Sequence, residues 1–285
     1  MNPQGVLKGV AKTALGMAVV RAHESLRGDR LFDDPYAQRF LDAAPGAFPG
    51  QSASAEDLAA MGPSASLGAL FAFHGVLRTR FFDDCLLAAT AAGCQQVVLL
   101  AAGLDARAFR LSWPDGVRVF ELDLPEVFAF KEAVLDGLGA MPACERRTVP
   151  VDLRAGWAGR LVAAGFDRAV PAAWLAEGLL LYLTADEVTR LLSEVGELST
   201  PGSRLAFEHG GIADPAVLAQ ARGMPTLDEY TPLWRGGLGE DAPGRLGRNG
   251  WRPHIHDRAE LAASYGRPIP GPSGGGFLTA TRTGR

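Results

Sequence analysis

The sequence lacks the features that mark several protein classes. Its three cysteines, Cys85, Cys94 and Cys144, show no C-x-x-C spacing, so neither a disulfide framework nor a zinc site is indicated. No apolar run approaches the roughly 20 residues of a membrane-spanning helix, and the N-terminus lacks the charged, apolar and small-residue order of a secretory signal. There is no basic stripe with interleaved aromatics, and the formal net charge is −4. We therefore expect a cytoplasmic protein that binds neither nucleic acid nor membranes.

What the chain does contain is the pattern of an α/β protein. At 285 residues and 47% hydrophobic content it can form one large domain or a domain with a cap. From residue 96 onward, strand and helix signals alternate, which predicts a mainly parallel sheet. The expected strands lie near 97–101, 117–122, 146–150, 172–176, 203–208, 251–256 and 277–281. The expected helices lie near 125–137, 154–164, 185–198 and 257–264.

The remaining segments suggest how the chain is divided. Residues 1–92 read mainly as helices and are expected to form an N-terminal helical cap, with a mobile connection from Phe48 to Pro63 that is rich in Ala, Ser, Gly and Pro. Residues 93–285 would then form the core. Within it, an insertion at 210–250 carries many prolines and glycines and is expected to lie over the carboxyl ends of the strands, as a wall of an acceptor pocket.

The most informative stretch predicts a nucleotide-type pocket. An apolar run from Val97 to Ala102 without alternation is typical of a parallel strand buried on both faces, and Gly103 after it lets a ligand approach the backbone. The next expected strand ends in Glu121 and Asp123. A carboxylate at that place can accept two hydrogen bonds from a ribose diol, which favours a cofactor that contains adenosine.

The glycine pattern argues against a dinucleotide. A G-x-G-x-x-G turn leaves bare backbone for a pyrophosphate, but this chain has Ala101, Gly103 and Ala106 at the three places, followed by a charged turn. S-adenosylmethionine carries no phosphate and fits such a turn better.

These segments resemble a known family. LAAGLDARAFRL at 100–111 and FELDLP at 120–125 are similar to the signature of class I methyltransferases of the leucine carboxyl methyltransferase type, which include bacterial natural-product O-methyltransferases. The resemblance continues in order along nearly the whole chain. Its further segments are 13–40, RTRFFDD at 78–84, VDL at 151–153, AEGLLLYL at 176–183, GGLGE at 236–240 and HDRAEL at 256–261. One departure is Ala101, where the family usually has glycine.

The resemblance implies a Rossmann-like fold with a seven-stranded, mainly parallel sheet, helices on both faces and an antiparallel last strand. It also implies the cofactor S-adenosyl-L-methionine, with S-adenosyl-L-homocysteine as product, and assigns residues to it. Gly103 would allow close approach, Asp123 would bind the ribose, and Asp152 with Leu153 would bind the adenine.

At the methionine end of the cofactor, the resemblance implies Arg78 for the carboxylate and Glu177 for the amino group or the sulfonium region. Other interpretations stay open for the cofactor residues. Glu121 is the alternate to Asp123, both aspartates could instead cap helices, and Arg78 could be a solvated arginine, with Arg80 or Arg21 near the carboxylate. Because an unpaired buried carboxylate is costly, Glu177 is expected to have a cationic or hydrogen-bonding partner.

On the acceptor side, Tyr182 and His209 are the candidate catalytic residues, since they follow the fourth and fifth expected strands. His209 could equally be an ordinary hydrogen-bonded histidine. His254 and His256 share one face of a strand but lack a matching carboxylate or cysteine, so no metal site is expected.

The predicted function is therefore an S-adenosylmethionine-dependent O-methyltransferase acting on a carboxylate or hydroxyl of a small-molecule or peptide acceptor, in secondary metabolism. A nicotinamide-dependent oxidoreductase is an alternative, but the residues at Asp152 and Glu177 do not fit it. A catalytically inactive protein of the same fold is the other alternative, and Ala101 is its only support. The sequence does not indicate the oligomeric state.

Overall fold

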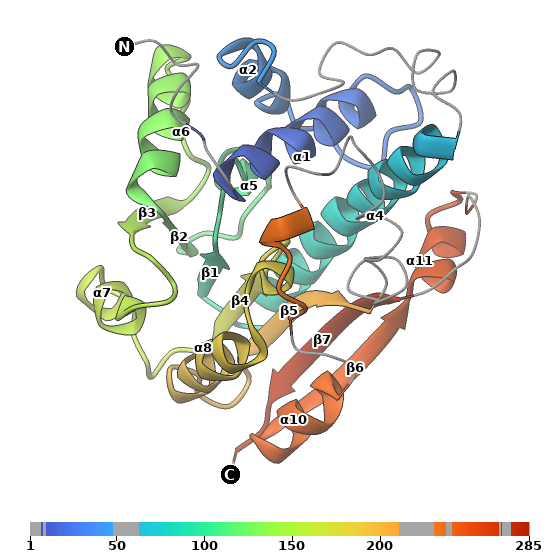
Figure 1. The fold of residues 1–285 in the computed structure, drawn as a ribbon. Coiled ribbons are helices and arrows are strands. Elements are labelled where there is room, and N and C mark those ends of the chain that lie inside the picture. Colours follow the sequence, from blue (N-terminus) through green and yellow to red (C-terminus); the bar gives the residue numbers. More distant parts are fainter. Residues whose placement is uncertain are drawn as a thin grey trace.

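The computed structural model describes residues 7, 10–47, 63–210, 231–237, 241–267, 269 and 275–284. Seven strands form one sheet in the order β3-β2-β1-β4-β5-β7-β6 (Figure 1). They are β1 (Gln96–Leu100), β2 (Arg118–Asp123), β3 (Glu145–Pro150), β4 (Ala172–Ala176), β5 (Arg204–His209), β6 (Trp251–Asp257) and β7 (Gly276–Arg282). Strands β1 to β5 are parallel, and β7 runs antiparallel between β5 and β6. This confirms the predicted seven-stranded sheet with its antiparallel last strand.

Helices cover both faces of the sheet. They are α1 (Val10–Ser25), α2 (Ala37–Asp42), α4 (Pro63–Ala91), α5 (Arg107–Arg110), α6 (Pro125–Gly137), α7 (Trp157–Ala163), α8 (Ala185–Glu197), α10 (Ala242–Arg248) and α11 (Arg258–Ser264), with short 3-10 turns η2 (Leu180–Tyr182) and η5 (Thr231–Leu233). None of the helices in the described ranges is long and apolar enough to cross a bilayer.

The central strands are buried on both sides, as their unbroken apolar runs predict. On one face, Val98 and Trp174 pack with side chains of α7, α8 and α10. On the other face, Val97 and Leu175 pack with side chains of α4, α5 and α11. Neighbouring residues of a strand point to opposite faces, so each strand contributes to both cores. The second half of α4 is thus part of the layer that covers the sheet.

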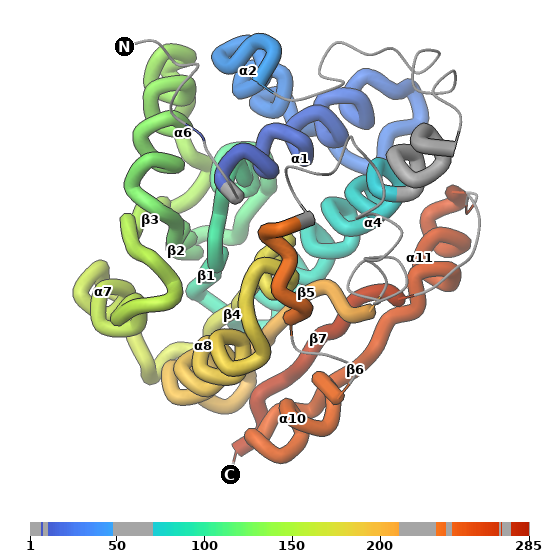
Figure 2. Tube along the Cα trace, in the orientation of Figure 1, coloured from blue at the N-terminus to red at the C-terminus, as the bar shows by residue number. Residues whose placement is uncertain are grey.

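A third core lies beyond the sheet. Helices α1 and α2 lie beside each other and pack with α6 through Leu15, Phe40 and Phe130 (Figure 2). This places α1 next to the loop that follows β1, because Leu104 of that loop belongs to the same cluster. The N-terminal helices therefore cover the carboxyl end of the sheet's centre.

Most predicted elements are confirmed within about three residues. Helix α7 begins at Trp157 and not near 154, because Gly156 has a left-handed backbone with φ +63° and residues before it form a turn. Two short helices, α5 and α10, were not predicted. The predicted connection from Phe48 to Pro63 lies outside the described residues apart from Pro63, as does most of the 210–250 insertion. The division into cap and core stays a prediction.

Candidate cofactor and acceptor site

The candidate site lies where the strand order reverses. Strand β1 has β2 on one side and β4 on the other, and parallel sheets bind ligands outside the carboxyl ends of the strands at such a place. Gly103 follows β1, Asp123 ends β2 and Glu177 follows β4. The sequence-predicted residues of three adjacent strands therefore meet at one edge of the sheet.

The turn after β1 has an unusual backbone. Ala101 and Gly103 both have positive φ, +56° and +51°, which glycine adopts freely and alanine does not. The backbone N–H of Gly103 donates to Oδ2 of Asp123 at 2.6 Å, and the N–H of Leu124 donates to Oδ1 at 2.7 Å. Burial raises the pKa of Asp123, and these two donors offset part of the rise. Asp123 thus fixes the β1 turn while its carboxylate stays at the edge of the sheet.

Glu121 has a structural role. Its side chain is fully buried, and its Oε2 accepts from Nζ of Lys131 at 2.7 Å and from Nη2 of Arg146 at 2.7 Å. Lys131 is also fully buried. The alternative in which Glu121 binds the ribose is therefore not supported, because its carboxylate is held between two cations inside the protein.

Asp152 and Leu153 follow the outer strand β3. The carboxylate of Asp152 is partly exposed and pairs with the Arg154 side chain at 2.6 Å, while it also accepts the backbone N–H of Arg154. The Arg154 hydrogen bond lowers the pKa of Asp152. Leu153 packs against the core. The structure shows the turn-forming role of Asp152, and its contact with adenine stays a prediction.

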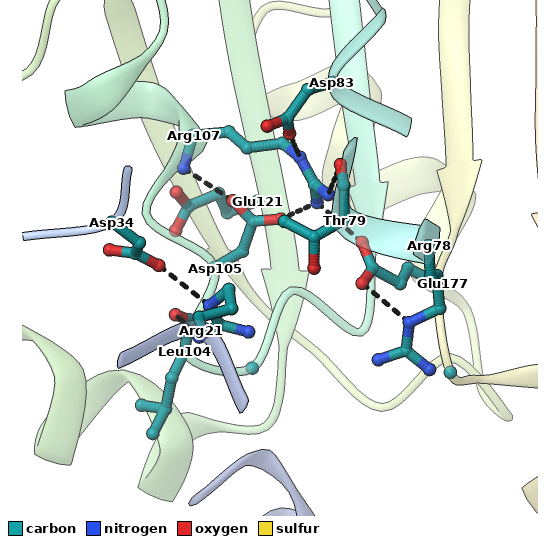
Figure 3. Close-up of polar contacts among 12 residues, drawn as sticks. Arg21, Asp34, Arg78, Thr79, Asp83, Leu104, Asp105, Arg107, Glu121 and Glu177 are labelled. Atoms are coloured by element: carbon teal, nitrogen blue, oxygen red, sulfur yellow. Dashed lines mark hydrogen bonds and ion pairs between the residues drawn. The ribbon is translucent and has the colours of Figure 1, made fainter. Parts of the chain in front are cut away.

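Arg78 of α4 joins the ends of β4 and β5. Its Nε donates to Oε1 of Glu177 at 2.9 Å (Figure 3). Its Nη1 donates to Oε1 of Glu208 at 2.8 Å. The backbone N–H of Gly178 also donates to the Glu208 carboxylate. Arg78 is therefore not a solvated surface arginine, and Glu177 has the cationic partner that its burial required. Arg80, by contrast, pairs with Asp84 and is partly exposed.

Arg107 is the centre of the network. Its Nη1 donates to Oε2 of Glu177 at 2.6 Å and to Asp105, and its Nε donates to Oδ1 of Asp83 at 2.6 Å (Figure 3). Arg110 also binds both oxygens of Asp83. One connected set of ion pairs thus reaches from α4 through α5 to the ends of β4 and β5.

The charges of this network do not balance. It contains three arginines and four carboxylates, an excess of one negative charge when all are ionised; its members are Arg78, Arg107, Arg110, Asp83, Asp105, Glu177 and Glu208.

The pKa directions within the network differ. Burial would raise the pKa of Glu177, but Arg107 and Arg78 outweigh it and lower the pKa. Burial would likewise raise the pKa of Asp105, but Arg107 and Lys131 hold it at about 2. For Glu208, burial outweighs Arg78 and the pKa is raised.

Arg21 positions the β1 turn, and a contact with the cofactor carboxylate stays a prediction. Its Nη2 donates to the backbone oxygen of Leu104 at 2.8 Å, and its Nε pairs with Asp34 at 2.8 Å (Figure 3). Asp34 in turn accepts the backbone N–H groups that begin α2. Arg21 thereby ties α1 and α2 to the loop beside Gly103.

Of the two acceptor-side candidates, Tyr182 lies in η2. Burial alone would lower the pKa of Arg78, but Glu177 and Glu208 outweigh it and raise the pKa, with a smaller contribution from Tyr182. His209 ends β5 opposite Gly276 of β7, and burial lowers its pKa. Residues 231–237 lie against the η2 loop, because the backbone N–H of Arg235 donates to the oxygen of Leu181 at 2.8 Å.

The two histidines of β6 form no metal site in the part of the chain that the structure describes. His256 Nε2 is bonded to Oγ1 of Thr279 at 2.8 Å, and the His254 ring packs edge to face on it. This pair is part of the sheet's edge.

Sequence reasoning missed several residues of this region. Arg107 and Asp105 stand within the LDARAFR segment, whose sequence indicates only a charged turn, although an arginine flanked by acids and apolar residues was an available signal. Glu208 and His74 gave no such signal, because only the fold brings α4 to the ends of β4 and β5.

Known proteins are similar to this chain along most of its length. The family model described as leucine carboxyl methyltransferase matches residues 14–196. A Frankia alni protein is 51% identical over 278 residues, covering 96% of this chain and 95% of its own, and a Streptomyces coelicolor protein is 43% identical over 281 residues, covering 96% of each. Both are named "Putative S-adenosyl-L-methionine-dependent methyltransferase".

Solved structures share the fold. A DUF574 family protein from Streptomyces avermitilis has a TM-score of 0.58 at 15% identity and covers 86% of this chain and 96% of its own. A Thermobifida fusca protein described as a "putative methyltransferase" has a TM-score of 0.54 at 17% identity and covers 99% and 97%. The Rossmann-like fold is thus shown.

Proposed function

Because the chain belongs to the leucine carboxyl methyltransferase family, whose members here are named S-adenosylmethionine-dependent methyltransferases, we propose that it transfers the methyl group of that cofactor to an oxygen atom of a small-molecule or peptide acceptor. The dependence on S-adenosylmethionine rests on the family. The choice of oxygen, and a role in secondary metabolism, rest on the resemblance of the motifs to natural-product O-methyltransferases.

The observation that carries the proposal is the placement of donors and acceptors at the switch point. Gly103 forms the turn after β1 against Ala14 of α1, Asp123 presents a carboxylate at the end of β2, and Glu177 presents one after β4. Carboxylates can accept the two ribose hydroxyls and bind an ammonium group. No pyrophosphate cradle is formed, since Ala101 occupies the turn. This donor set fits S-adenosylmethionine better than a dinucleotide.

We assign Arg78 and Glu177 to the amino acid end of the cofactor. A guanidinium binds a carboxylate through two parallel donors, and a carboxylate binds an ammonium group. Arg78 and Glu177 already pair with each other at 2.9 Å, so both are charged. The cation of Arg78 matches the carboxylate of a bound amino acid, and the anion of Glu177 matches its ammonium group. The bound cofactor supplies an activated methyl group on a sulfonium.

The protein's remaining task is to align the acceptor. Holding two reactants in line can contribute roughly 7 to 11 kcal/mol. A carboxylate acceptor, whose ordinary pKa is about 4, is ionised at neutral pH and needs only orientation, whereas a phenol with a pKa of about 10 benefits from a base. We propose Tyr182 and His209 as the residues that orient the acceptor or take its proton.

The test is methyl transfer from a cofactor whose methyl group carries carbon-13. The protein is incubated with separate hydroxyl-, carboxyl- and amino-bearing small molecules, and the labelled carbon is detected by NMR, which distinguishes methyl on oxygen from methyl on nitrogen. Label on oxygen supports the proposal. Label on nitrogen alone contradicts the choice of oxygen, and the absence of any transfer to a broad set favours the inactive alternative.

A further inference from the structure

Arg78 differs from the other two arginines of the ion-pair network in how many of its nitrogens are bonded. Arg107 uses all three, since its Nη2 also donates to the backbone oxygen of Thr79 at 3.4 Å. Arg110 uses Nη1 and Nη2 on Asp83, and its unbonded Nε is buried. Arg78 uses only Nε and Nη1 within the described residues, and its Nη2 is not among the buried unbonded atoms. In this part of the chain, Nη2 of Arg78 therefore remains for a ligand.

The exposed fractions of the side chains agree with this difference. Arg78 is 12% exposed, whereas Arg107 and Arg110 are 3% and 4% exposed. Glu177 and Glu208, which both bind Arg78, are 14% and 19% exposed. The accessible end of the network thus consists of Arg78 and the two glutamates at the ends of β4 and β5, at the edge of the sheet where we propose that the cofactor binds.

Glu208 holds the guanidinium of Arg78 in place. Its Oε1 accepts from Nη1 of Arg78 at 2.8 Å and from the backbone N–H of Gly178 at 2.8 Å, and its Oε2 accepts from the same N–H at 3.0 Å. Glu177 binds the same guanidinium through Nε at 2.9 Å. Because a guanidinium is planar and rigid, fixing two of its nitrogens also fixes the direction of the third. The two glutamates together therefore aim Nη2.

Gly178 gives this arrangement its support. Its backbone has φ +64°, which glycine adopts freely. A Cβ atom at this position would already touch Nη1 of Arg78, at 3.4 Å. The guanidinium thus lies on bare backbone, and the same residue donates its N–H to both oxygens of Glu208. The main chain fixes Glu208, and Glu208 in turn fixes Arg78.

The contact between Arg78 and Glu208 does not block a ligand. Each terminal nitrogen of a guanidinium carries two hydrogens, so Nη1 keeps a second N–H after one has bonded Glu208. That N–H and those of Nη2 can bind a carboxylate of a ligand, and Glu208 need not leave Arg78 first. The contact is therefore compatible with a support for the bound state and is not a competitor that the cofactor must displace.

These observations deepen the proposed function, on which the inference rests. We propose that Glu208 is a positioning residue for the amino acid end of the cofactor, which holds Arg78 so that its free Nη2 donates to the cofactor carboxylate. Glu208 acts through the placement of its oxygen atoms and does not touch the reacting atoms. Without it, the guanidinium would keep only its bond to Glu177 and would turn about that bond.

The test uses two probes that share the adenosine and the thioether. S-adenosylhomocysteine carries the amino acid end, and 5′-methylthioadenosine lacks it. Dissociation constants for the full chain are measured by calorimetry. Glu208→Asp keeps the charge but withdraws the carboxylate by one methylene, so that it cannot reach Arg78 and Gly178 together. S-adenosylhomocysteine should then bind about tenfold more weakly, and 5′-methylthioadenosine should bind within about twofold of its wild-type affinity.

Three further variants show whether position is what matters. Glu208→Gln loses the charge but keeps an oxygen at the place of Oε1, and should retain S-adenosylhomocysteine within about threefold. In an Arg78→Lys background, Glu208→Asp should change that affinity by less than about twofold, because Glu208 acts through the guanidinium. Glu197→Asp makes the same change at an exposed residue at the end of α8, and should bind both probes as the wild type does.

The outcomes separate this inference from the proposed function. Equal weakening of both probes in Glu208→Asp would show a general structural role and overturn the inference. So would unchanged or tighter binding of S-adenosylhomocysteine in that variant, or a loss in Glu208→Gln as large as in Glu208→Asp. A wild-type chain that binds the two probes equally would contradict the assignment of Arg78 to the cofactor carboxylate, and with it both proposals. Retained binding of 5′-methylthioadenosine shows that a variant is folded.

Discussion

Glu121 and Asp123 lie two residues apart on β2, yet the structure gives them different tasks, and matched substitutions should separate them. Glu121→Gln removes a charge from inside the protein. Asp123→Asn removes a charge from the cofactor edge of the sheet. We expect Glu121→Gln to lower stability and leave cofactor binding intact. We expect Asp123→Asn to weaken cofactor binding with little loss of stability.

The cost at Glu121 follows from its partners. Lys131 is fully buried and forms its ion pair with Glu121, at 2.7 Å, so the substitution leaves an ammonium group buried without that opposite charge. Arg146 is less affected because it also pairs with Glu132. Removing one partner of a buried ion pair costs about 3 to 5 kcal/mol. For a chain of this size that corresponds to a fall in melting temperature of roughly 6 to 20 °C.

The cost at Asp123 falls mainly on binding. Asparagine keeps one acceptor oxygen and loses one of the bonds to the Gly103 and Leu124 N–H groups, about 1 kcal/mol of stability. Loss of charge-assisted bonds to a ribose diol costs about 1.5 to 3 kcal/mol, or roughly 10- to 150-fold in the dissociation constant. Calorimetric titration with S-adenosylhomocysteine and thermal unfolding measure the two effects. Unchanged binding in Asp123→Asn, or lost binding in a folded Glu121→Gln protein, would show that the two carboxylates do not divide their roles in this way.

Three further predictions concern the network and the β1 turn. Burial raises the pKa of Glu208 above its ordinary 4.5, so the contribution of this group to stability is full below pH 4.5 and is lost as the pH rises through the folded pKa. Glu208→Gln should therefore become more stable relative to the wild type as the pH is raised from about 4 to about 8 in urea unfolding. A stability difference that stays constant with pH would argue against this. Ala101→Gly should stabilise the protein by about 0.5 to 1 kcal/mol. The left-handed backbone of alanine costs about 1 to 2 kcal/mol, and the greater chain entropy that glycine loses on folding costs about 0.5 to 1 kcal/mol. A lower melting temperature for the variant would show that Ala101 is not strained. Arg107→Lys keeps the charge but replaces a wide guanidinium fork, whose Nε and Nη1 bond Asp83 and Glu177, by one compact nitrogen. The loss of one charged hydrogen bond should lower the unfolding free energy by about 1.5 to 3 kcal/mol in urea unfolding, and a change below about 0.5 kcal/mol would show that the fork is not needed.

The fold was predictable from sequence because its central strands are buried on both faces. The apolar runs ending at Leu100 and Ala176 have no alternation, and each proves to be a central strand. Helix α8 was equally clear, since Thr184 and Glu187 form a capping box at its start. Short elements were missed: α5 spans four residues, too few for a helical period to show.

The site was predictable only in part, for a physical reason. Residues that follow strands, such as Asp123 and Glu177, can be placed from the order of the sheet alone. Glu208 joins the network only because the fold packs α4 against the end of β5, and nothing local in the sequence marks it. Glu121 shows the converse, because its place on β2 suggested a ligand role, whereas its carboxylate is buried in ion pairs with Lys131 and Arg146.

The choice between S-adenosylmethionine and a dinucleotide at the switch point can be decided by one binding measurement. Calorimetric titration of the wild-type chain with S-adenosylhomocysteine is run with NADH titrated alongside. We predict one-to-one binding of S-adenosylhomocysteine with a micromolar dissociation constant and no binding of NADH. Binding of NADH, or a folded protein that does not bind S-adenosylhomocysteine, would show that the site is not built for S-adenosylmethionine.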